Sequence, residues 1–563
     1  MKKICLILLF LGNIFYGQSP IPIDYFANPL NINLILSGDF GELRANHFHS
    51  GLDIKTQQRE GIPVYASADG HVSRINVQHY GYGKALYILH PNGYTTVYGH
   101  LQSYAGEIEK YVKANQYQKE TYEIELFPES SVLPVKKGDL VGYSGNTGGS
   151  GGPHLHFEIR DSAQRPMNPL LFGIEIPDSK IPIVTSLFAY PISEDAHVNQ
   201  SQNRTKLRLI KQKDGSYKTE NLTAFGKLGF GISTFDQQDG ASNKNGVYRI
   251  TSTMNNIPKF DVRFDKFSFD ETRYLNRYTD YQYYMTNKSQ VQKLFRETNN
   301  PLSLIVQEDD NGYVRIQDSL NYSYTISVKD FKGNNLLIVI PIEGKKMEIL
   351  DKKEIIKTDD YINADHATSI TKGKFSIYIP ANSLYEDVYL DIQAKGDTLK
   401  FHEDVVPIHK FITITTDISN YQDEDKDRLF LGRLGFRGKP NYTTTTREGN
   451  KLTARTRTFG DYAVISDTLA PEIKPVNFDE GKWISDQQEL KIKITDDLSG
   501  ISSYRATING KFILMEYEYK KNLLTYSFKD DINQETENNL KLIVVDNVGN
   551  NTTFEAKFFR KQI

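Results

Sequence analysis

Histidine and aspartate residues gather at three places in the first third of this sequence. His49 and Asp53 stand four residues apart in NHFHSGLDI, His100 lies in YGHL, and His154 and His156 flank one leucine in PHLHFEIR. Imidazole and carboxylate groups are ligands of catalytic zinc sites, which use three protein ligands and leave a fourth position for water. These residue types therefore indicate hydrolysis assisted by a metal ion.

We expect His49, Asp53 and His156 to bind one zinc ion (Zn²⁺). They supply two imidazoles and a carboxylate, whereas a structural zinc site requires four ligands and usually includes cysteine. Water in the open position still needs groups that accept its proton and stabilise the oxyanion, and we assign this role to the catalytic residues His100 and His154. The sequence does not decide which of these two is the general base.

PHLHFEIR has the alternation of a β-strand, in which every second side chain shares a face. His154, His156 and Glu158 then lie on one face, while the apolar residues between them point into a core. Glu158 is open to two interpretations. Its carboxylate either orients a histidine from behind or forms an ordinary ion pair with Arg160 or contacts solvent.

The strands that must position these residues begin at Ile62, where apolar residues alternate and glycines interrupt them. ALYIL and YTTVY flank a PNG turn and predict a hairpin. One helix is expected at 107–122. GNTGGSGG lacks the Gly-Lys-Ser/Thr ending of a phosphate-binding loop, and we expect it to let a peptide backbone approach the strand closely. His47 and His90 have no partner in the pattern, so we expect both to be structural.

At this point the motifs resemble a known family. HSGLDI, YGHL and GNTGGSGGPHLHFEI, with GIPVYASADGHV and VKKGDLVGYSG between them, are similar in order and spacing to the zinc endopeptidases of the lysostaphin and LytM type. The resemblance covers about residues 41–173. It implies zinc ligands at His49, Asp53 and His156, catalytic histidines at His100 and His154, and the peptide cross-links of peptidoglycan as substrate. Many relatives have lost some of these positions and only activate other wall enzymes, but here all are filled.

One departure from the family is an insertion at 102–133, which contains the expected helix. The insertion adjoins His100, so it either shapes or covers the groove, or it is a surface decoration.

The remaining two thirds of the chain is rich in predicted strands and poor in histidine. VKDFKGNN (Val328–Asn335) is echoed by VVDNVGNN (Val544–Asn551), and STFDQQDGAS by KITDDLSGIS. We expect two immunoglobulin-like β-sandwiches on either side of another β-rich module, and we interpret their Asp/Asn/Gly clusters as turn chemistry. The acidic run DEDKD lacks the glycine and glutamate of an EF-hand, so we expect a solvated loop.

The expected fold class is all-β and mainly antiparallel, with a LytM-type catalytic domain followed by several β-sandwich domains. The expected domains are a signal peptide at 1–17, the peptidase domain at 18–174, an immunoglobulin-like sandwich with an insertion at 175–345, a β-rich module at 346–466 and a C-terminal sandwich at 467–563.

The chain begins with two lysines and a twelve-residue apolar run, which predicts a cleavable export signal that ends after Gly17. No later run is long enough to span a bilayer. The only cysteine, Cys5, lies in that signal, so the mature chain has no disulfide. A formal net charge of -3 gives no field that would favour nucleic acid.

We therefore expect an exported zinc metalloendopeptidase of the periplasm or cell envelope that hydrolyses peptidoglycan cross-links. If the substrate is a Gram-negative cross-link, the target is a D-alanyl to diaminopimelate bond. The sandwiches are expected to bind a wall polymer or an envelope protein. The alternative is a noncatalytic envelope regulator that uses the peptidase fold to bind a partner.

Overall fold

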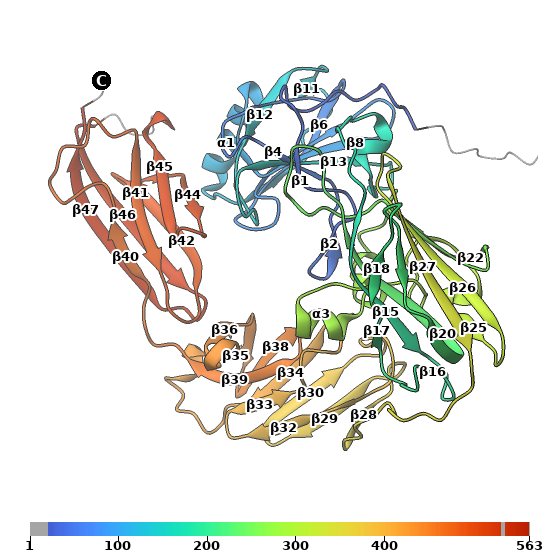
Figure 1. Cartoon of the computed structure of the whole chain (residues 1–563). Helices are drawn as coiled ribbons and strands as arrows, with labels where there is room; N and C mark the ends of the chain where they lie inside the picture. Colours follow the sequence, from blue (N-terminus) through green and yellow to red (C-terminus); the bar gives the residue numbers. More distant parts are fainter. Residues whose placement is uncertain (1–20, 531–534, 562–563) are drawn as a thin grey trace, which may run out of the picture.

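The computed structural model describes residues 21–530 and 535–561 (Figure 1). The expected signal peptide at 1–17 lies outside these residues. We call residues 21–174 the N-terminal segment, 175–345 the first sandwich, 346–466 the middle sandwich and 467–561 the C-terminal sandwich. The predicted all-β, mainly antiparallel fold is confirmed. All paired strands are antiparallel except β19 (Tyr217–Thr219) with β27 (Asn335–Gly344), and β20 (Leu222–Phe235) with β27.

The N-terminal segment is built on one large sheet with a three-stranded sheet beside it. The large sheet has the order β1 (Leu36–Gly38), β4 (Leu52–Lys55), β13 (His154–Arg160), β8 (Thr95–Gly99), β7 (Lys84–Leu89), β6 (Gly70–Val77), β10 (Ile124–Leu126). The smaller sheet has the order β5 (Pro63–Tyr65), β12 (Leu140–Ser144), β9 (Leu101–Tyr104). The expected hairpin is the pair β7 and β8.

β13 lies between β4 and β8 near the middle of the large sheet, and both of its faces are buried. Leu155, Phe157 and Ile159 have no exposed surface, as the alternation predicts. The opposite face is also buried, because Glu158 is fully covered and Arg160 is 6% exposed. The core of this segment continues into the first sandwich, where Phe264 and Phe267 belong to the same cluster. The polar face of β13 is therefore held within a rigid, packed interior.

The expected helix in the insertion is present as α1 (Gly106–Lys119). Its buried face consists of Ile108, Val112 and Gln116, which are spaced four residues apart and so lie on one side of a helix. Glu107 and Glu109 in the first turn complement the positive end of the helix dipole. None of the described helices is long and apolar enough to cross a membrane.

The first sandwich is a thirteen-stranded assembly joined by the long strand β20. Its principal strands are β15 (Ile183–Pro191), β21 (Arg249–Met254), β22 (Ile257–Arg263) and β26 (Asn321–Lys329). The middle sandwich has two five-stranded sheets. The first has the order β29 (Thr368–Lys372), β30 (Phe375–Ile379), β34 (Ile412–Asp417), β38 (Lys451–Thr456), β37 (Thr445–Glu448). The second has the order β32 (Ile392–Lys395), β33 (Thr398–Phe401), β39 (Gly460–Ser466), β35 (Leu429–Leu434), β36 (Pro440–Tyr442).

The C-terminal sandwich has two four-stranded sheets around its own core. One sheet has the order β40 (Glu472–Pro475), β41 (Glu489–Thr495), β45 (Leu523–Ser527), β44 (Met515–Glu518), and the other has the order β43 (Lys511–Ile513), β42 (Ile501–Ile508), β46 (Glu537–Asp546), β47 (Asn551–Phe559).

The four segments follow one another around a ring, and the C-terminal sandwich returns to α1 of the N-terminal segment (Figure 1). Tyr117 of α1 donates to Asp530 Oδ2 at 2.6 Å, and Lys113 also forms an ion pair with Asp530. Lys84 Nζ lies 2.8 Å from Glu516 Oε1 of β44. The insertion therefore forms part of the surface on which the C-terminal sandwich docks.

The buried side of β13 makes a direct prediction about stability. Leu155→Ala should lower the free energy of unfolding by about 2–5 kcal/mol, because truncation of a fully buried leucine leaves a cavity. Leu140→Ala is the matched control, since Leu140 is 41% exposed in the same segment. Urea denaturation followed by circular dichroism measures both. Equal losses for the two variants would contradict the assigned core.

Candidate metal centre and active site

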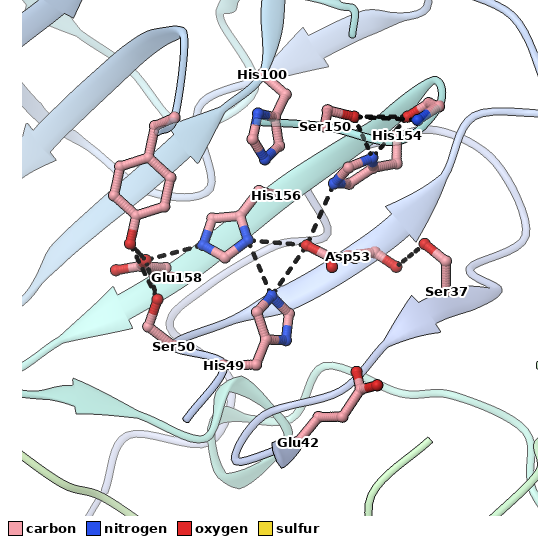
Figure 2. Close-up of polar contacts among 12 residues, drawn as sticks. Ser37, Glu42, His49, Ser50, Asp53, His100, Ser150, His154, His156 and Glu158 are labelled. Atoms are coloured by element: carbon pink, nitrogen blue, oxygen red, sulfur yellow. Dashed lines mark hydrogen bonds and ion pairs between the residues drawn. The ribbon is translucent and has the colours of Figure 1, made fainter. Parts of the chain in front are cut away.

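Three potential metal ligands meet where β4 and β13 pair. The antiparallel register sets His156 directly opposite Asp53, and His49 lies in the turn that precedes β4. His156 Nδ1 is 2.8 Å from Asp53 Oδ1, His49 Nε2 is 3.0 Å from the same oxygen, and the two nitrogens are 3.1 Å apart (Figure 2). All three side chains are less than 10% exposed. The three atoms form a small, nearly equilateral triangle.

The outer nitrogens of both rings fix which nitrogen carries the proton. His49 Nδ1 lies 2.6 Å from the carbonyl oxygen of Asp39, and His156 Nε2 lies 2.8 Å from Glu158 Oε1. Each of these oxygens can only accept, so each outer nitrogen must be the donor. In the neutral rings the inner nitrogens are then unprotonated, and their lone pairs point toward Asp53 Oδ1. Three electron-pair donors thus converge on one point.

This triangle fits a tetrahedral zinc ion. With zinc–ligand bonds of about 2.0–2.1 Å, ligand atoms in a tetrahedral site are about 3.3 Å apart, slightly more than the sides of the triangle. The second oxygen of Asp53 accepts from Arg44 Nη2 at 2.9 Å. Burial opposes the charge of Asp53, but His49 and the hydrogen bonds of His154 and His156 hold its pKa well below its usual value. The site has the chemistry that a divalent cation requires.

Glu158 supports His156 from behind within a buried network. Its Oε1 accepts from His156, from Ser50 Oγ at 2.6 Å and from Tyr82 OH at 2.5 Å, while Oε2 accepts from Arg160 Nε at 2.6 Å. Burial alone would raise the pKa of Glu158, but the charge of Arg160 and the His156 hydrogen bond hold it well below the usual range. Both interpretations of Glu158 therefore apply, because it orients the imidazole and pairs with the arginine.

His156 has a raised pKa in the absence of a metal ion. Burial disfavours its charged form, yet hydrogen bonds to Asp53 and Glu158 raise the pKa to about 9. In the metal-free site His156 therefore keeps an extra proton at neutral pH, and a bound cation would replace that proton.

His100 and His154 lie side by side next to the triangle, with ring centroids 4.7 Å apart. Nδ1 of His100 is 2.8 Å from the carbonyl oxygen of Thr147, and Nδ1 of His154 is 2.8 Å from that of Gly152. Each Nδ1–H must therefore donate, and each neutral ring keeps an unprotonated Nε2. His154 Nε2 is 3.3 Å from Asp53 Oδ1. Figure 2 shows both rings above the three candidate ligands.

His100 is held in an uncommon state. Its φ angle is 58°, in the left-handed region that costs energy for a residue with a side chain. Burial, followed by the charges of His156 and His154, lowers the pKa of His100 to about 3. The ring is therefore neutral at physiological pH.

The glycines of the loop between β12 and β13 fall into two groups, one packed against neighbouring backbone and one with open space around it. A Cβ on Gly145 would lie 2.4 Å from the Gln102 nitrogen, and one on Gly148, where φ is +71°, would lie 2.3 Å from the Gly83 nitrogen. These two glycines are required for contact with neighbouring backbone. Gly151 and Gly152 have open space around them. Only this second pair matches the expected approach of a peptide backbone.

The C-terminal sandwich forms hydrogen bonds to the same loop. Lys520 Nζ donates to the carbonyl oxygens of Asn146, Gly148 and Ser150 at 2.5, 3.0 and 3.2 Å. The loop carries the Thr147 carbonyl that orients His100. A residue near the end of the chain therefore braces the loop that positions a candidate catalytic histidine.

The structure brings together all five residues singled out from the sequence and leaves out two others. His47 is exposed and its ring hydrogen-bonds to the carbonyl oxygen of Ala45, while His90 hydrogen-bonds to the Asp69 carbonyl and Thr96 at the hairpin. Sequence reasoning missed three supporting residues, Arg44, Ser50 and Tyr82. Ser50 follows His49 directly, but Arg44 and Tyr82 have no motif that would reveal them.

The segment that carries this site is similar to known peptidases. Residues 47–117 and 131–169 match peptidase family M23, and residues 359–467 match the Zu5-like domain. This match lies within the N-terminal segment, and it confirms the resemblance to peptidases of the lysostaphin and LytM type. The gap in the match, residues 118–130, falls inside the insertion expected at 102–133.

The similar curated proteins include a DD-carboxypeptidase/endopeptidase, peptidoglycan DD-endopeptidases and a metalloprotease. The chain is 35% identical over 130 residues to DD-carboxypeptidase/endopeptidase Mpg of Neisseria meningitidis serogroup B, a match that covers 23% of this chain and 24% of that protein. It is 38% identical over 122 residues to an uncharacterized metalloprotease of Haemophilus influenzae, covering 22% and 20%. Peptidoglycan DD-endopeptidase ShyA of Vibrio cholerae matches at 33% over 131 residues, covering 23% and 24%. The chain spans about a quarter or less of the length of these relatives.

Among solved structures, a zinc-containing peptidase from Vibrio cholerae is 26% identical, with a TM-score of 0.20. The match covers 27% of this chain and 41% of that one.

The Glu158 network yields a prediction about metal affinity. Glu158→Gln should weaken zinc binding by about 10–100-fold, because the neutral amide no longer fixes and polarises His156. It should also destabilise the fold by about 3–5 kcal/mol, because buried Arg160 loses its charge partner. A competition titration with a chromophoric chelator measures the affinity. Glu125→Gln, which breaks the exposed pair with Arg74, should change neither quantity.

Proposed function

We propose that this chain is an exported zinc-dependent endopeptidase that hydrolyses peptide cross-links of bacterial peptidoglycan. The observation that carries the proposal is the convergence of His49 Nε2, His156 Nδ1 and Asp53 Oδ1 on one point, with both nitrogens unprotonated in the neutral rings. His49, Asp53 and His156 would hold the zinc ion. The family match and the DD-endopeptidase names of several relatives support the substrate class.

The remaining histidines have the geometry for proton transfer. When bound, zinc supplies Lewis acidity for a peptide carbonyl and for water. In its neutral form each of the rings of His100 and His154 has an unprotonated Nε2 on the same side of the site, so either neutral ring can accept the proton of an attacking water. The ring that has accepted a proton can then donate it to the departing amine or to the oxyanion. The Thr147 and Gly152 carbonyls keep both rings in the tautomer that this exchange needs.

The target bond that we propose is the D-alanyl to diaminopimelate bond of a direct cross-link. Relatives named peptidoglycan DD-endopeptidases support this choice over other bonds.

Digestion of purified peptidoglycan tests the proposed function. The zinc-loaded chain from residue 18 onward should release cross-link fragments that mass spectrometry identifies, and His156→Ala should abolish the release together with zinc binding. His47→Ala is the matched control, because His47 is an exposed histidine outside the site. If the folded, zinc-loaded wild-type chain releases nothing, the enzyme is excluded and the noncatalytic envelope regulator is the better account.

The two catalytic histidines make a separate prediction. His100→Ala and His154→Ala should each lower the rate of cross-link cleavage by about 10²–10⁴-fold, because a positioned acid or base is lost. Each variant should still bind one zinc ion per chain, as measured by metal analysis. His71→Ala removes an imidazole of the same segment that lies outside the site, and it should keep full activity. Loss of zinc from His100→Ala would show that His100 is a ligand.

A further inference from the structure

Two groups of three aspartates lie outside the candidate metal centre. One is in the first sandwich and one is in the C-terminal sandwich, the two segments that contain the repeated sequences. Within each group, carboxylate oxygens lie within 4.8 Å of one another. The groups are Asp178, Asp236, Asp330 and Asp467, Asp496, Asp546. In each group the first residue precedes the first strand of its sandwich, and the other two come from the echoed loops. The same cluster therefore occurs twice in the chain.

The two clusters share their detailed geometry. The Oδ1 atom of Asp330 accepts from the Asn334 N–H at 2.8 Å, and its Oδ2 accepts from Asn334 Nδ2 at 2.6 Å. Asp546 makes the same two contacts with Asn550, also at 2.8 and 2.6 Å. These turns fix each aspartate in place. They do not neutralise its charge.

Among the described residues the carboxylates are not ion-paired, although Lys332 lines the same cavity as the first group. Within residues 21–530 and 535–561, none of the six aspartates forms an ion pair with lysine, arginine or histidine. Asp236 and Asp330 are 5% and 4% exposed, and Asp467 and Asp546 are 1% and 2% exposed. Burial and the charge of neighbouring Asp178 raise the pKa of Asp236 to about 8. Buried carboxylates this close require either a proton or a metal ion between them.

Unpaired oxygens provide a second, independent observation. Asp178, Asp236, Asp330 and Asn245 line one cavity of about 40 Å³, which is large enough for a water molecule or an ion. Asn245 is 4% exposed, and neither its Oδ1 nor the Oδ1 of Asp236 has a hydrogen-bond partner in the described structure. In the second cluster Ser499 is 2% exposed, its N–H donates to Asp467, and its Oγ has no partner there. Buried polar oxygens left unpaired are costly unless a ligand satisfies them.

We propose that each of these sandwiches binds one calcium ion at its three-aspartate cluster. The available donors are carboxylate, amide, hydroxyl and carbonyl oxygens, which hard cations prefer, and no histidine or cysteine belongs to either group. Calcium accepts six to eight oxygens in irregular geometry, whereas magnesium demands a nearly ideal octahedron. The proposal does not depend on the zinc site or on peptidase activity.

Both ions would lie at junctions of the ring. The first cavity is also lined by Leu36 and Asp39 of the N-terminal segment. At the second cluster, the Asp467 N–H donates to the carbonyl oxygen of Arg428 in the middle sandwich at 2.9 Å. Calcium at these points would therefore stiffen two of the joints that determine where the C-terminal sandwich rests.

The test uses the full zinc-loaded chain, with calcium chloride as the probe. Native mass spectrometry should count two calcium ions per chain, and a thermal melt should shift upward with calcium and less with magnesium. Asp236→Asn and Asp546→Asn should each lose one ion, and the double variant should lose both. Asp423→Asn, in the exposed acidic loop, should keep both ions.

The calcium-free melt separates a binding site from a structural role. Without calcium, Asp236→Asn should melt no lower than the wild type, because it removes repulsion between carboxylates, but calcium should no longer stabilise its sandwich. Failure of the folded wild type to bind calcium would overturn the proposal, and so would unchanged binding by the double variant. A calcium-free Asp236→Asn that melts well below the wild type would also contradict it, since the carboxylate would then be structural.

Discussion

β4 and β13 pair with His156 opposite Asp53, and the arrangement of the candidate metal ligands depends on that register. Because side chains alternate along a strand, a slip of one residue would turn His156 into the core and bring Leu155 or Phe157 to the polar face. The full burial of those two residues makes such a slip prohibitively unfavourable. The packing of the sheet therefore fixes how the candidate ligands Asp53 and His156 face each other.

Hydrogen bonds to main-chain carbonyls orient the histidine rings of the site. Carbonyls of Asp39, Thr147 and Gly152 each receive an Nδ1–H, and this one device sets the tautomer of three different histidines. Only His156 uses a carboxylate instead, and it belongs to a buried charge network with Arg160. A charged partner therefore orients His156, while neutral carbonyl dipoles orient His49, His100 and His154.

Local patterns in the sequence predicted much of this arrangement. The strand of PHLHFEIR, the helix at α1 and the five candidate site residues follow from spacing and residue type, since each depends on near neighbours or on a distinctive motif. Arg44 and Tyr82 could not be found in this way, because their partners are defined only when distant strands pack. The three-aspartate clusters were interpreted as turns for the same reason. Asp330 and Asp546 do form turns, and nothing in a linear sequence shows that three aspartates meet at each cluster.

The docking of the C-terminal sandwich on α1 and the glycine-rich loop affects how other molecules can compete for that loop. Because the sandwich is tethered through the ring, its Lys520 meets the loop at an effective concentration on the order of millimolar, whatever the concentration of the protein. Dilution of the protein would not release this contact. A competing molecule that approaches the loop from the same side must overcome that local excess, whereas a substrate entering at Gly151 and Gly152 would avoid it.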